Sequence, residues 1–268
     1  LERSRRLRGE QHELTLRYAS NLASVLAGQG RLEDAAPYCE EALAGYTALL
    51  GDRHPTVLEA RSDLAMLLEQ LGRLAEAESL LVGVVKLAPE VLGPEHPMVY
   101  AFSNNLAGLL QVSNRHAEAL PLLEAAYRYN LRQRGPRHPE TFTVANNLAG
   151  SLEGLDRFAE AESLYVKTLA GRRELLGADH PDAIASLNNL GFLYRHQGRR
   201  REAEPLFREA WERFGRVLGA KHPSTLVAAS NVGNLLNEMN RHAAAEPINA
   251  EVLAGLREAL PPDHWLQG

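Results

Sequence analysis

The stretch that decides the fold is residues 138–177, HPETFTVANNLAGSLEGLDRFAEAESLYVKTLAGRRELLG. Pro139 suits the first position of a helix, and apolar residues then recur at spacings of three and four up to about residue 155. Asp156 suits a turn, and a second amphipathic run follows over residues 158–176. Gly177 is a typical residue for ending a helix. The stretch therefore predicts two helices joined by a tight turn.

The same pattern returns every 42 residues along the chain. Seven of the ten histidines follow this step, at His12, His54, His96, His138, His180, His222 and His264. An arginine column runs from Arg31 to Arg241 and an alanine column from Ala35 to Ala245 in the same register. A fixed period of this length indicates stacked helical hairpins, in which each repeat buries its apolar face against its neighbours. We predict an all-α solenoid of antiparallel helix pairs.

The register also predicts where each repeat begins and ends. The six full repeats are residues 12–53, 54–95, 96–137, 138–179, 180–221 and 222–263. Residues 1–11 match the tail of a preceding second helix, and residues 264–268 match the start of a truncated repeat. We therefore expect the array to belong to a larger protein.

Composition narrows the classes of function. There are 29 basic and 34 acidic side chains, which give a net charge of −5, so nucleic acid is a poor candidate partner. No apolar run is long enough to cross a membrane, and the single cysteine suits a reducing compartment, so we expect a cytoplasmic protein. We expect Cys39 to be a buried core thiol, because it shares its repeat position with large apolar residues.

Catalysis and metal binding are not indicated. Equivalent histidines of stacked repeats should lie roughly 10 Å apart, too far to share one metal ion. The His-Pro pairs are better explained as helix starts. No catalytic, metal or cofactor site is predicted, and we expect the chain not to be an enzyme.

One repeat carries a family resemblance. Residues 187–194 read LNNLGFLY, and Gly198-Arg199 and Glu202-Ala203-Glu204 follow. This pattern resembles the tetratricopeptide repeat (TPR), and its 42-residue form is similar to the kinesin light chain type. The resemblance implies a right-handed solenoid whose concave face, lined by first helices, receives an extended peptide. It further implies that the second Asn of each Asn-Asn pair, together with Arg172 and Arg195, contacts this ligand.

The residues themselves also favour a peptide-binding groove. An Asn side chain offers both donors and an acceptor, so it can satisfy the backbone of a peptide of any sequence. The same asparagines would equally well stabilise contacts between neighbouring repeats, and both interpretations stay open. The candidate groove residues are Asn104, Asn105, Asn146, Asn147, Asn188, Asn189, Asn231, Glu69, Gln111, Glu153, Phe192, Arg195 and Arg172.

These positions predict a charge pattern and a function. Glu59 and Glu69 make the groove acidic at the second repeat, and Arg195 and His196 make it partly basic at the fifth. We expect a ligand with a basic residue near Glu69 and an acidic group near Arg195. The predicted function is a scaffold that binds a protein or peptide. The alternative is a sensing or autoinhibitory arm of a larger signalling or defence enzyme.

Overall fold

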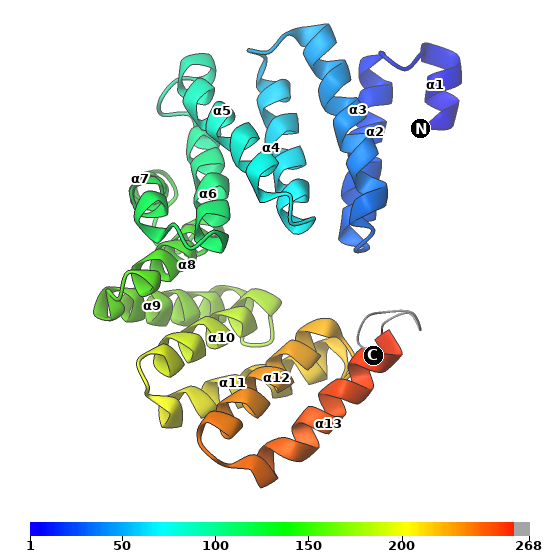
Figure 1. Ribbon diagram of the computed structural model, residues 1–268. Helices are drawn as coiled ribbons and strands as arrows, with labels where there is room; N and C mark the ends of the chain where they lie inside the picture. Colours follow the sequence, from blue (N-terminus) through cyan, green and yellow to red (C-terminus); the bar gives the residue numbers. More distant parts are fainter. Residues whose placement is uncertain (260–268) are drawn as a thin grey trace. The chain divides into compact units, whose positions relative to one another are not determined.

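The structure, a computed structural model, describes residues 1–259 of the chain. Within these residues the chain forms thirteen α-helices and no β-strand. The helices are α1 (Glu2–Arg8), α2 (Glu13–Gly28), α3 (Leu32–Leu50), α4 (Pro55–Gln70), α5 (Leu74–Leu92), α6 (Pro97–Val112), α7 (His116–Gln133), α8 (Pro139–Gly154), α9 (Phe158–Leu176), α10 (Pro181–His196), α11 (Arg200–Leu218), α12 (Pro223–Glu238) and α13 (His242–Ala259). Helix pairs follow one another along the chain, which confirms the all-α solenoid (Figure 1). The predicted start of a further repeat at residues 264–268 lies outside the described residues.

The repeated histidines cap the first helix of each pair. The imidazole Nδ1 accepts a hydrogen bond from the backbone N–H two residues later, at 3.2 Å in His138 and 3.1 Å in His222. His12, His54, His96 and His180 make the same bond. Each bond satisfies one of the backbone donors that a helix start leaves unpaired. The predicted role of these histidines in starting helices is confirmed.

Left-handed residues make the turns between paired helices, as the sequence predicts. Asn114, Asp156 and Asn240 have φ values of 58°, 58° and 57°. Gly30, Gly72 and Gly198 take the same place in the other repeats. Asn, Asp and Gly tolerate this backbone region better than other residues do.

The chain divides into two compact units, unit 1 (Leu1–Tyr129) and unit 2 (Asn130–Gly268, described to Ala259). The core of each unit is a series of local clusters that join consecutive helices. In unit 1, for example, Leu58 of α4 packs with Val84 of α5 and Phe102 of α6. In unit 2, Phe207 of α11 packs with Val232 of α12 and Ile248 of α13.

Cys39 differs from its prediction. The side chain is partly buried rather than fully buried, beside the cluster that contains Ala23 and Ala35. Its pKa is raised to about 11, first by burial and then by the charges of Asp63 and Glu40. The thiol therefore stays protonated at neutral pH.

The arginine column joins neighbouring repeats. Arg115 pairs with Glu118 at the start of its own helix and with Glu78 of the preceding second helix, at 2.7 Å and 2.6 Å. Arg199 makes the equivalent pairs with Glu202 and Glu162. Exposed pairs contribute little individually, but their repetition fixes how successive second helices are aligned.

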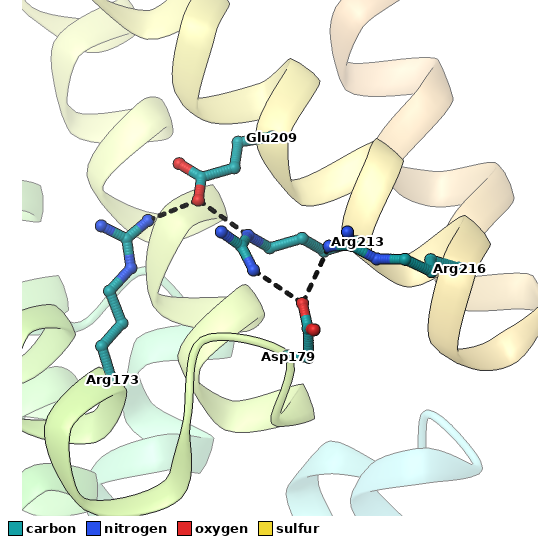
Figure 2. Close-up of polar contacts among 5 residues, drawn as sticks. All are labelled: Arg173, Asp179, Glu209, Arg213 and Arg216. Atoms are coloured by element: carbon teal, nitrogen blue, oxygen red, sulfur yellow. Dashed lines mark hydrogen bonds and ion pairs between the residues drawn. The ribbon is translucent and has the colours of Figure 1, made fainter.

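A second set of ion pairs links the last turn of α9, the loop before α10 and the middle and end of α11 (Figure 2). Glu209 lies 2.8 Å from Arg173 and 2.7 Å from Arg213, and Arg213 lies 2.6 Å from Asp179 in the loop before α10. Arg216 also reaches Asp179, at 2.9 Å. These five charged side chains are paired with one another, and we do not assign them to the candidate site. The candidate site lies on the first helices.

Candidate functional site

Side chains 43 residues apart meet across neighbouring first helices. The Nδ2 of Asn105 donates to the Oγ of Ser62 at 3.0 Å, and the Nδ2 of Asn189 donates to the Oδ1 of Asn146 at 2.8 Å. In both cases the second residue of an Asn-Asn pair bonds to the first residue of the equivalent pair one repeat earlier. We call this series of positions the amide ladder. The rungs at Asn105 and Asn189 join α4 to α6 and α8 to α10.

The next rung of unit 2 is not closed. Asn188 on α10 and Asn231 on α12 occupy the positions equivalent to Asn146 and Asn189. The Oδ1 of Asn188 and the Nδ2 of Asn231 are buried, and neither has a hydrogen-bond partner among the described residues. One atom is an acceptor and the other a donor. Buried polar atoms without partners are costly, and a ligand could supply the missing donor and acceptor only if a local movement of α10 and α12 exposed the two atoms.

Phe192 lies one helical turn beyond Asn188 on α10. Its ring packs edge-on against Phe207 of α11, with ring centroids 5.1 Å apart. Gly191 makes this arrangement possible, because a Cβ atom there would lie 2.6 Å from the Phe207 ring. The equivalent positions in the two preceding repeats are Gly108 and Gly150. An aromatic ring therefore lies beside the open rung, where the two preceding repeats have glycine.

A second ladder of polar and charged pairs follows two turns further along the same helices. The Nδ1 of His196 lies 3.4 Å from the Oε1 of Glu153, and the Nε of Arg195 donates to the Oε1 of Glu238 at 2.9 Å. Both pairs again have the 43-residue step. Tyr165 donates its hydroxyl to the other oxygen of Glu153 at 3.2 Å. The guanidinium of Arg195 lowers the pKa of Glu238, with Arg200 as a further cause.

These charged groups line a pocket of about 350 Å³ in unit 2. Its walls are Glu153, Phe192, Arg195, His196, Arg200 and Glu238. Glu153, Phe192 and Arg195 were expected in the groove from the sequence, and the structure brings them together here. The pairing of Arg195 with Glu238 was not expected, so the basic character predicted for the fifth repeat is partly neutralised.

The first helices of unit 1 carry a different charge. Glu59, Asp63 and Glu69 project from α4, and none forms a salt bridge with another residue of the described chain. The pKa of Asp63 is raised, first by burial and then by the charge of Glu59. Burial also raises the pKa of Glu69. The acidic character predicted for the second repeat is therefore present on α4.

The other candidate residues lie on the expected helices. Asn104 and Gln111 belong to α6 in unit 1, and Asn147 belongs to α8 in unit 2. Within the 42-residue repeat, Asn104 is equivalent to Asn188, Gln111 to Glu153 and Asn147 to Asn189. Their contact with a ligand stays a prediction.

Arg172, which was predicted to contact the ligand, is buried between helices. Its side chain is only 7% exposed. The Nη1 donates to the Oγ of Ser186 at 2.9 Å and to the backbone oxygen of Asp182, and the Nη2 donates to Thr143. Arg172 thus joins α8, α9 and α10, and a ligand could reach it only if these contacts opened.

No group of three or more His, Cys, Asp or Glu side chains in the described part of the chain is placed to hold a metal ion. None of the described helices is both long and apolar enough to cross a membrane.

Paired helices at a 42-residue step, with polar ladders across the first helices, define a solenoid scaffold. The sequence profile of the tetratricopeptide repeat family matches residues 16–90, 98–174, 140–214 and 182–258. The chain belongs to the tetratricopeptide repeat family, and similar solved structures are of the kinesin light chain type.

Solved structures share the fold. A Podospora anserina putative kinesin light chain with nearly identical TPR-like repeats is 26% identical, with a TM-score of 0.64 over 77% of this chain and 98% of that one. BtubC (BKLC) from P. vanneervenii is 22% identical, with a TM-score of 0.67 over 87% and 93%. A Rap protein complexed with competence and sporulation factor is 10% identical, with a TM-score of 0.63 over 91% and 75%. No curated protein sequence matches this chain.

Proposed function

We propose that this scaffold binds an extended polypeptide along the first helices of unit 2. The observation that carries the proposal is the open rung between Asn188 and Asn231. A peptide group carries one N–H donor and one C=O acceptor, which complement the Oδ1 of Asn188 and the Nδ2 of Asn231 once a local movement of α10 and α12 exposes these atoms. Phe192 supplies an apolar surface one turn away for a side chain of the ligand.

The charges of the first helices indicate which charged residues the ligand should carry. The unpaired carboxylates of α4 favour a basic ligand residue at the first helices of unit 1. In the pocket of unit 2, Arg195 and His196 are paired with Glu238 and Glu153, so an acidic ligand residue there competes with these two carboxylates. The function proposed is binding without catalysis, and the half-buried protonated thiol is compatible with a cytoplasmic setting.

The test begins with peptides selected from a random displayed library on the wild-type chain. Their affinities are then compared between wild type and the double variant Asn188→Ala/Asn231→Ala. Two lost hydrogen bonds of about 1 kcal/mol each predict binding weaker by about tenfold or more. Gln133→Ala is the matched control, because it removes an exposed amide at the end of the second helix α7.

Equal affinity of the double variant and wild type for every selected peptide would contradict the proposal. A loss shared by Gln133→Ala would contradict it too, since that residue is not on a first helix.

A further inference from the structure

Glu238, one of the two carboxylates in the pocket of unit 2, is held by two arginines from different elements. Arg195, near the end of α10, donates through Nε to the Oε1 of Glu238 at 2.9 Å, and its Nη2 also contacts this oxygen. Arg200, at the start of α11, donates through Nε to the Oε2 at 3.3 Å. Both oxygens of Glu238 are therefore occupied, as they would be in a bound ligand carboxylate.

The positions of Glu238 and Arg200 oppose the electrostatics of their own helices. Glu238 is the last residue of α12, where the helix dipole disfavours an anion. Arg200 is the first residue of α11, where the dipole disfavours a cation. The other first helices end at Gly28, Gln70, Val112, Gly154 and His196, none of which is acidic. Helix formation alone therefore does not account for this pair.

The pair is also accessible. The side chains of Arg195, Glu238 and Arg200 keep 35%, 30% and 43% of their exposure, and they border a pocket of about 350 Å³. A carboxylate at the surface can leave its arginine partners and rotate into solvent at a modest cost in free energy, because water then solvates it. The two arginines would then be free to bind another anion in the same place.

We propose that Glu238 is an internal competitor for the anionic group of a ligand. It excludes weakly acidic segments from this pocket and admits strongly acidic ones. The ligand group is the side-chain carboxylate of an acidic polypeptide. This inference rests on the proposed function of the first-helix face. An acidic segment binds by displacing Glu238 from Arg195 and Arg200, so only segments with enough negative charge compete effectively.

The test removes the charge of Glu238 and keeps its shape. Binding of a labelled oligoglutamate peptide and of an oligoglutamine peptide of equal length is measured at low salt by fluorescence polarisation. We expect Glu238→Gln to bind oligoglutamate at least about threefold more tightly than wild type, with oligoglutamine binding unchanged. Glu212→Gln is the matched control, because it makes the same charge change at an exposed residue of α11.

The double variant Glu238→Gln/Arg195→Gln assigns the gain to the pocket, and we expect it to lose the extra affinity. The inference is overturned if Glu238→Gln and Glu212→Gln strengthen oligoglutamate binding equally, or if neither differs from wild type.

Failure of the proposed groove is a separate outcome. Unchanged peptide binding by Asn188→Ala/Asn231→Ala would reject the groove. A gain confined to Glu238→Gln would still support the anion pocket.

Discussion

Asparagine has two different roles at the same position of neighbouring repeats. Asn189 closes a rung of the amide ladder by donating to Asn146, whereas the Nδ2 of Asn231 is buried without a partner among the described residues. A closed rung stabilises the contact between two repeats. An open rung leaves a desolvated polar atom and lowers stability, and residues of this kind are typical of binding sites.

This difference predicts opposite effects of one substitution. Asn189→Ala leaves the Oδ1 of Asn146 without its donor, so we expect a loss of about 1–3 kcal/mol in the free energy of unfolding. Asn231→Ala removes an unsatisfied donor, so we expect no loss and up to about 0.7 kcal/mol of gain from helix propensity. Both changes alter helix propensity equally, which makes each the control of the other. Urea unfolding followed by circular dichroism measures both, and equal losses would show that the two rungs do not differ.

The sequence predicts which residues share a face but not which residues bond. The column spacing placed Asn188, Phe192 and Arg195 together on α10, because helical periodicity alone determines that. Pairing across helices follows the 43-residue step, one residue longer than the repeat, and this offset depends on how neighbouring helices pack. The burial of Arg172 depends on the same packing, so its buried position could not be predicted either.

At the scale of the element, the boundaries follow from the caps. Histidine is not among the preferred N-cap residues, yet its Nδ1 accepts from the backbone here in six repeats. This requires the neutral ring with its proton on Nε2. The His-Pro spacing predicted these starts well because both the cap and the fixed φ of proline act locally.

The caps predict a graded effect at one helix start. His180→Ala removes the acceptor for the backbone N–H of Asp182, and we expect a loss of about 1 kcal/mol. His180→Asn supplies a different acceptor at the same place, so we expect it to retain most of the stability. The midpoint of urea unfolding measures both variants. If the alanine and asparagine variants are equally destabilised, the imidazole has a role other than capping.

At the scale of the whole molecule, the contacts that hold the chain together are local. Core clusters join consecutive helices, and the ion pairs of the arginine column reach one repeat back. Stability in such an array is close to a sum over neighbouring repeats. A perturbation in one repeat should therefore decay along the chain rather than spread through it.

Gly171 offers a way to test this locality. It lies in α9 opposite the ring of Phe142, where an added Cβ would be 2.3 Å from the ring. Gly171→Leu should therefore overpack this contact and cost about 1–3 kcal/mol or more. Gly83→Leu makes the same change in α5, where nothing lies within 4 Å of the added Cβ, and should not destabilise the chain.

Amide hydrogen exchange shows which helices lose stability in the Gly171→Leu variant. In Gly171→Leu we expect faster exchange in α8, α9 and α10 of unit 2, and unchanged exchange in α2 to α5 of unit 1. Gly83→Leu should leave both sets of helices as in wild type. Equal acceleration in both units would mean that the array unfolds as one cooperative block. A ligand bound at the open rung of unit 2 would then stabilise unit 1 as well, whereas local coupling confines its effect to the repeats beside it.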